Sequence, residues 1–123
     1  MRSVSAHCDL PCGVYDPAQA RIEAESVKAT QEKYKGSDDP VFRERAIAIK
    51  EERADMVKHH LWVLWTDYFK PEHLEKHPEL HELFWNATKE AGAAKKSQDP
   101  AQGQKLLDLI DQIAEVFWAT KAA

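Results

Sequence analysis

The chain has 123 residues, 43% of them hydrophobic and 31% charged, which fits one globular domain. Its 17 lysine and arginine residues against 21 aspartate and glutamate residues give a formal net charge of -4. Because affinity for phosphate comes mostly from clustered basic side chains, this balance argues against a nucleic-acid binder. The longest strongly apolar run, residues 61–65, is far too short to cross a bilayer, which excludes a membrane-spanning protein.

Three aspartate–proline pairs, at residues 16–17, 39–40 and 99–100, indicate where helices begin. An aspartate side chain can cap a free backbone N–H group, and proline suits the first helical position because its nitrogen needs no partner there. A further helix is predicted from apolar residues at helical spacing after Pro78. The predicted helices cover about residues 17–35, 40–68, 79–95 and 100 onward.

Residues 72–77 lie between Pro71 and Pro78 and are predicted to form a non-helical connection, because proline removes a backbone donor and restricts the preceding residue. No segment shows sustained strand alternation, and the connections are short. The sequence therefore predicts an all-α, antiparallel up-and-down four-helix bundle over residues 16–123. The expected core residues are Ala20, Ala24, Val27, Tyr34, Phe42, Ala46, Ile49, Met56, Leu61, Leu64, Trp65, Leu80, Leu83, Phe84, Ala87, Ala91, Leu106, Ile110, Ile113 and Phe117.

Before the first helix, residues 7–15 read HCDLPCGVY and are dense in metal-binding side chains. Cys8 and Cys12 are the only cysteines, so no disulfide framework holds the bundle together. Two thiolates at this spacing can reach one ion if the chain turns sharply, and Pro11 and Gly13 favour such a turn. Together with His7 they make three ligands, whereas a closed zinc site normally has four. The segment is therefore an incomplete metal loop, a loop completed by backbone groups, or a pair of inert or disulfide-bonded thiols.

The same residues match the pattern His-Cys-x-x-Pro-Cys-Gly-x-Tyr, and this pattern resembles the nickel-binding hook of the nickel-containing superoxide dismutases. The helical pattern that follows, the length from His7 to Ala123 and the stretch at residues 68–71 are similar to that family as well. The resemblance implies an oxidoreductase that converts superoxide to dioxygen and hydrogen peroxide by Ni(III)/Ni(II) cycling, with one nickel ion per subunit.

The resemblance also implies the nickel ligands. These are the thiolates of Cys8 and Cys12, the backbone nitrogen of Cys8, and the amino group and imidazole of His7. A planar set of nitrogen and sulfur donors suits Ni(II) better than zinc. Since residues 1–6 precede His7, the resemblance implies a leader that a processing peptidase removes, followed by the hook at 7–15 and the bundle at 16–123. A leader this short is no secretory signal, so we expect a cytoplasmic protein.

Family roles around the metal carry over where residues match. Tyr15 matches the residue that narrows access to the metal, with Tyr68 in support. Glu23 and Arg53 match the residues that hold the imidazole of His7 in place. Without the resemblance, the two charged residues would be ordinary surface charges on helices.

Two further residues, Asp9 and Lys70, match positions that pin the hook across a subunit boundary, and Lys70 also offers positive charge to the incoming superoxide anion. The family assembles as a homohexamer, so the resemblance implies a homo-oligomer here.

Two other function classes remain open at the level of the sequence. A non-catalytic metal carrier or thiol redox sensor would use Cys8 and Cys12 without turning over superoxide. A plain helical interaction module would need neither cysteine.

A competing metal site at His73, His77 and His81 has the spacing of one helix face, which Pro78 interrupts. His59 and His60 are predicted to lie at the surface or the edge of the core.

Overall fold

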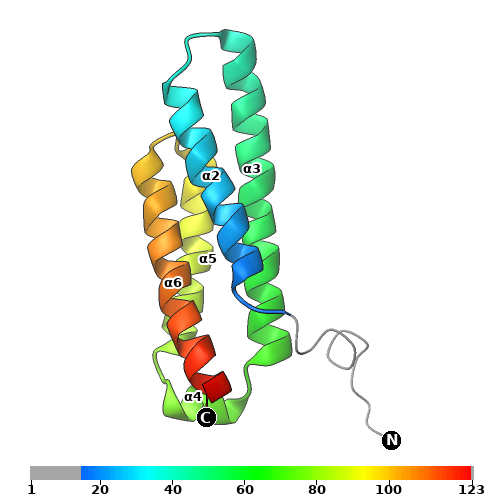
Figure 1. Cartoon of the computed structure of the whole chain (residues 1–123), viewed down its shortest axis with the longest axis vertical. Coiled ribbons are helices and arrows are strands. Elements are labelled where there is room, and N and C mark those ends of the chain that lie inside the picture. The colour runs from blue at the N-terminus through cyan, green and yellow to red at the C-terminus, as the bar shows by residue number, and fades with distance from the viewer. Residues whose placement is uncertain (1–14, 123) are drawn as a thin grey trace, which may run out of the picture.

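The computed structural model of the protein describes residues 15–122. Its long helices run alternately up and down (Figure 1). The first packs against the second and the last, and the third packs against the same two, so the four form a closed square. This arrangement confirms the predicted antiparallel four-helix bundle. In chain order the long helices are α2 (Ala18–Lys35), α3 (Pro40–Val63), α5 (Leu80–Lys96) and α6 (Pro100–Ala122).

The predicted aspartate caps are all present. In Asp16, Asp39 and Asp99, the Oδ1 atom accepts a hydrogen bond from the backbone N–H group two residues further on, at 2.7, 3.0 and 3.0 Å. These bonds satisfy donors that lack partners at a helix start. They explain why three of the four long helices begin where the sequence predicts.

The connection between α3 and α5 corrects one prediction. Helix α3 continues into a single turn of π-helix, η1 (Leu64–Tyr68), and a short helix, α4 (Pro71–Lys76), follows it. The predicted non-helical connection at 72–77 is therefore wrong over most of its length. Proline is compatible with helix at the first position, and Pro71 stands there, while Pro78 comes after the helix has ended. One short helix fits between the two prolines.

Apolar side chains from all four long helices form one core, and most of the predicted core residues are buried in it. The stripe predicted on α3 is partly wrong, because Ile49 is 42% exposed and the next residue, Lys50, is fully buried. The inward face runs through Ala46, Lys50 and Ala54 at intervals of four residues. Because Lys50 is charged, the sequence pattern placed Ile49 on the buried face of α3 in its stead. The predicted core residues that are only partly buried are Tyr34, Phe42, Met56, Trp65 and Leu83.

The turn between α5 and α6 is closed by two buried polar side chains from the other helices. Lys50 of α3 donates through Nζ to the carbonyl oxygens of Lys95 and Ser97, at 2.6 and 2.8 Å. Gln31 of α2 donates through Nε2 to the same Ser97 carbonyl at 3.0 Å. Because the last carbonyls of a helix lack intrahelical partners, these side chains cap the end of α5. Burial lowers the pKa of Lys50, and the charge of Glu51 opposes that shift.

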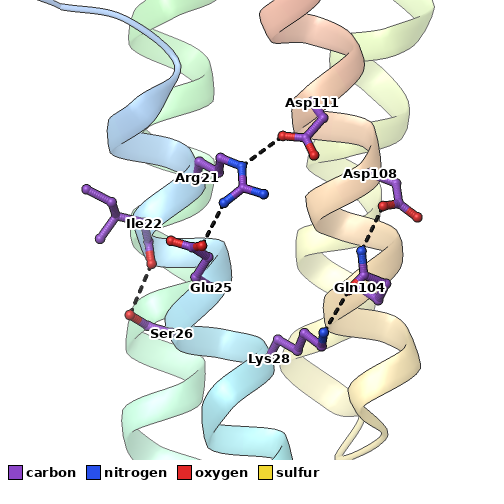
Figure 2. A network of polar contacts seen from close by, with 8 residues as sticks. All are labelled: Arg21, Ile22, Glu25, Ser26, Lys28, Gln104, Asp108 and Asp111. Atoms are coloured by element: carbon purple, nitrogen blue, oxygen red, sulfur yellow. Dashed lines mark hydrogen bonds and ion pairs between the residues drawn. The ribbon is translucent and has the colours of Figure 1, made fainter.

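Polar contacts link α2 to α6 along one surface of the bundle (Figure 2). Arg21 Nε lies 2.8 Å from Asp111 Oδ1, and Lys28 Nζ donates to Gln104 Oε1 at 2.7 Å. Gln104 in turn donates to Asp108 at 2.8 Å. Exposed pairs of this kind contribute little to stability, so we regard them as fixing the register of two closely packed helices.

The close approach of α2 and α6 depends on Gly103. A larger residue at this position is therefore expected to reduce the stability of the bundle. A Cβ atom at this position would lie 2.7 Å from Lys28 Cα and 2.6 Å from Gln31 Oε1. Gly103→Ala is therefore expected to lower the free energy of unfolding by about 1–3 kcal/mol through overpacking, measured by urea denaturation. Gly92→Ala is the matched control, because there the added Cβ meets only the flexible end of Lys58 at 3.4 Å. An equal loss in both variants would contradict the close packing at Gly103.

Candidate metal centre

The predicted nickel ligands His7, Cys8 and Cys12, together with Asp9, lie outside the described residues 15–122. The described chain begins at Tyr15 and enters α2 beside the C-terminal half of α3 (Figure 1). Within the described part of the chain, no three histidine, cysteine, aspartate or glutamate side chains are grouped so that they could hold a metal ion. Since both cysteines of the sequence are in the hook, a metal centre with thiolate ligands has to be built there.

Tyr15 is joined to α3 by a hydrogen bond with His60. The tyrosine hydroxyl oxygen lies 2.5 Å from His60 Nδ1, and the two ring centroids are 5.9 Å apart. Both side chains are partly buried, and Tyr15 also packs against the hydrophobic core. The last residue of the hook is thus attached to the bundle through a histidine 45 positions later in the chain.

The surroundings of this pair keep both side chains neutral near pH 7. Burial raises the pKa of Tyr15 to about 12, and the charge of Asp67 adds to the shift. Burial and the neighbouring His59 lower the pKa of His60, while the charge of Glu23 opposes them. A neutral phenol carries its proton, and a neutral imidazole has one nitrogen free to accept it. In the tautomer of His60 with its proton on Nε2, the tyrosine hydroxyl is the donor and Nδ1 the acceptor.

Glu23 and Arg53, both predicted near the metal, form an ion pair between α2 and α3. Arg53 Nη1 lies 3.0 Å from Glu23 Oε1, and Arg53 Nη2 lies 3.0 Å from Glu52 Oε1. The Glu23 side chain is only 15% exposed, whereas Glu52 is mostly in solvent. The hydrogen bond to Glu52 has the largest effect on the pKa of Arg53, followed by the hydrogen bond to Glu23. Both raise this pKa above its usual value. Because Glu23 also acts on the pKa of His60, this ion pair and the Tyr15–His60 pair belong to one region of the α2–α3 interface.

Tyr68 ends the π-helical turn η1, and its ring packs against the core. Its hydroxyl is 2.8 Å from Thr120 Oγ1 of α6, and its ring stacks on His73 at 5.4 Å and meets Phe117 at 4.5 Å. Single π-helical turns inside longer helices are common at functional sites. Here the hydroxyl contact with Thr120 places Tyr68 against the C-terminal end of α6, which lies at the same end of the bundle as α4 (Figure 1).

Lys70 is exposed at the start of α4, and its backbone N–H group donates to His73 Nδ1 at 3.0 Å. The competing histidine site is not formed within residues 15–122. The Nδ1 atom of His73 already accepts the hydrogen bond from Lys70, and the ring of His81 lies edge-on against Trp65.

No helix within the described range is both long and apolar enough to span a membrane.

Comparison with known proteins identifies the family. The family model described as nickel-containing superoxide dismutase matches residues 2–121. The chain belongs to the nickel-containing superoxide dismutase family. It is 67% identical over 121 residues to the nickel superoxide dismutase of Streptomyces coelicolor, and the match covers 98% of this chain and 92% of that protein. The family resemblance inferred from the hook is confirmed.

Solved nickel superoxide dismutases have the same fold. The native 1.30 Å structure has a TM-score of 0.90 and 67% identity, covering 95% of this chain and 100% of that chain. The crystal structure of a variant with phenylalanine in place of the tyrosine at residue nine has a TM-score of 0.91 and 66% identity, with the same coverage. Our protein is accordingly a nickel-dependent superoxide dismutase, an oxidoreductase that disproportionates superoxide and uses nickel as its cofactor.

The residues of the hook fit the metal that the family requires. Thiolates are strong donors that suit soft or easily oxidised metals, and Cys8 and Cys12 are the two thiols that the sequence offers. His60, in contrast, was predicted only to lie at the surface or the edge of the core. Its contact with Tyr15 depends on how α2 packs against α3, and no spacing in the sequence announces a pair 45 residues apart.

Proposed function

We propose that the hook, residues 7–15, holds one nickel ion per chain through the thiolates of Cys8 and Cys12, the backbone nitrogen of Cys8, and the amino group and imidazole of His7. When bound, nickel supplies the one-electron oxidation and reduction that disproportionation of superoxide requires. The observation that carries the proposal is that both thiols of the chain lie in the hook, which Tyr15 joins to the bundle. Planar nitrogen and sulfur donors are the set that Ni(II) prefers.

An amino group on His7 requires removal of residues 1–6, and we propose that a processing peptidase cuts between Ala6 and His7. Removing six residues from 123 leaves 117, or 95% of the chain, and 95% of this chain matches the native relative along its whole length. In the tyrosine variant of a relative, the ninth residue is the one replaced, and the ninth residue counted from His7 is Tyr15. The organisation proposed is a leader at 1–6, a hook at 7–15 and a bundle at 16–123.

Glu23 is proposed to orient the imidazole of His7. A carboxylate that accepts the free N–H group of a metal-binding histidine fixes the tautomer and raises the basicity of the ligand. The ion pair with Arg53 at 3.0 Å keeps that carboxylate in one place, and only 15% of the Glu23 side chain is exposed. Tyr15 is proposed to narrow access to the metal. Burial raises the pKa of its hydroxyl to about 12, so the hydroxyl keeps its proton at neutral pH.

The remaining residues of the site are proposed to act from the periphery. Asp9 and Lys70 pin the hook across a subunit boundary, and the exposed Lys70 also attracts the superoxide anion. This local charge matters because the whole chain is acidic. Tyr68 supports Tyr15 from the η1 turn, where Thr120 holds its hydroxyl at 2.8 Å.

We propose that the enzyme works as a homohexamer in the cytoplasm. Five large apolar side chains of the described residues are more than half exposed in the single chain, and two of them, Trp62 and Trp85, line one groove. Contiguous apolar exposure is typical of surfaces that another subunit covers. A reducing compartment is favoured because it keeps the two hook thiols available as ligands. The exposed side chains are Ile22 (58%), Val41 (65%), Trp62 (55%), Trp85 (57%) and Trp118 (53%).

His7→Ala tests the ligand set. In a chain that begins at residue 7, this variant keeps a terminal amine but loses the imidazole, so we expect it to retain part of the nickel and to lose most of its turnover. A reduction of at least about 10- to 100-fold is expected, since losing a partner of a metal ligand already costs that much. Nickel content by atomic absorption and superoxide decay by stopped flow provide the two readouts.

His77→Ala is the matched control for this variant, because His77 lies after α4 and makes a 3.8 Å contact with Glu79. Its turnover and nickel content are expected to equal those of the unaltered enzyme. If His7→Ala turned over superoxide at the unaltered rate, the imidazole would have no part in the reaction.

A further inference from the structure

His60 makes a contact that none of the roles above requires. It lies in the last turn of α3, and its Nδ1 is 2.5 Å from the hydroxyl of Tyr15. We propose that His60 is a positioning residue for the nickel hook, which it holds in place by accepting the hydrogen bond of Tyr15. This proposal rests on the proposed function, because it requires Tyr15 to stand beside the metal.

The histidine is well suited to hold another side chain still. Its carbonyl oxygen accepts a hydrogen bond from the N–H group of Leu64, the first residue of η1, so its backbone belongs to regular helix. Its ring is partly buried, whereas the neighbouring His59 is exposed. A partly buried side chain on regular helix has few rotamers open to it, so the ring offers Nδ1 in a nearly fixed direction.

The hydrogen bond can form with Tyr15 as donor. Near pH 7 the Tyr15 hydroxyl carries its proton, because its pKa is raised to about 12, and His60 is neutral, because burial lowers its pKa. We assign His60 the tautomer with its proton on Nε2, in which Nδ1 is free to accept from the tyrosine hydroxyl. An acceptor of any kind at the Nδ1 position should serve the same purpose.

Fixing Tyr15 restricts the metal ligands because the two are close in the chain. Cys12 is three residues before Tyr15, so their Cα atoms are separated by at most about 11 Å. Pro11 and Gly13, which flank Cys12 in the sequence, favour a turn, and Tyr15 contacts α3 three residues after Cys12. Loss of the His60 contact is expected to widen the range of positions open to the Cys12 thiolate.

The test compares two substitutions of His60 in the nickel-loaded enzyme that begins at His7. His60→Leu fills similar space but has no acceptor, whereas His60→Asn keeps an oxygen near the position of Nδ1. His59→Leu makes the same apolar change one residue earlier, at an exposed position. Tyr15→Phe removes the hydrogen bond from its other end.

His60→Leu is expected to raise the nickel dissociation constant by about two- to tenfold, the value of one hydrogen bond, and to broaden the electron paramagnetic resonance signal of the oxidised metal. His60→Asn should restore both, and His59→Leu should change neither. The double variant with Tyr15→Phe should be no worse than either single variant, because both remove the same bond. Melting temperatures measured on each variant separate these effects from a general loss of stability.

Three outcomes would overturn the inference, and they differ in whether the proposed place of Tyr15 beside the metal fails as well. If Tyr15→Phe changes the nickel signal while His60→Leu does not, His60 has no positioning role and the proposed place of Tyr15 stands. If neither variant changes the signal, the proposed place of Tyr15 beside the metal fails as well. Equal effects of His60→Leu and His59→Leu would also count against the inference, since His59 does not contact Tyr15 through the bond described.

Discussion

Replacing either Cys8 or Cys12 by serine is expected to abolish superoxide dismutation and leave the helical content unchanged. Serine keeps its proton at neutral pH and is a far weaker metal ligand than a thiolate, so it cannot support the oxidised metal. Losing a residue that only orients a ligand costs about 10- to 100-fold, so losing the ligand itself should exceed about a hundredfold. Stopped-flow decay of superoxide and circular dichroism provide the two measurements.

The helical content is expected to survive because the helices lie within residues 18–122, after both cysteines in the chain. Ser26→Ala is a suitable control, since its hydroxyl only donates to the carbonyl of Ile22 within α2 (Figure 2). Appreciable dismutation by either cysteine variant would mean that the metal is held elsewhere.

The largest loss of stability is expected at Lys50, a fully buried residue that caps the end of α5. Lys50→Ala should lower the free energy of unfolding by about 3–5 kcal/mol, because it leaves a cavity where the aliphatic stem packed and removes two hydrogen bonds to the end of α5. Lys50→Met keeps most of the volume and should cost less, about 1–3 kcal/mol. Urea denaturation followed by circular dichroism measures both values.

The difference between the two variants separates packing from capping. The Ser97 carbonyl keeps Gln31 as a donor in both variants, so the Lys95 carbonyl bears most of the capping loss. Lys33→Ala, an exposed lysine on α2, is the control and should be nearly neutral. A Lys50→Ala variant as stable as the unaltered protein would show that the cap contributes nothing.

Local signals in the sequence were sufficient to predict most of the fold. The aspartate–proline pairs act through hydrogen bonds between residues two positions apart, so the sequence alone shows them. Lys50 escaped prediction because its burial depends on carbonyl groups 45 and 47 residues away. The short helix α4 escaped because two prolines were taken to exclude a helix between them, although Pro71 begins one.

The candidate site could be predicted where its chemistry is contiguous in the chain. His7, Cys8 and Cys12 form a recognisable hook within six residues, and the family match bears out the metal. Glu23 and Arg53 were predicted by resemblance alone, and the structure brings them together at 3.0 Å. His60 had no signal of either kind, because two neighbouring histidines on a helix face different directions and only packing decides which one meets Tyr15.

The most direct test of the account compares two nickel-loaded samples, the chain as printed and the same chain beginning at His7. We predict about one nickel ion per chain and rapid dismutation in the shorter form only, because only there does His7 offer its amino group. Metal content and superoxide decay are measured on both. Equal activity in the two forms would contradict ligation by the amine, and nickel binding without activity in both would favour a metal carrier.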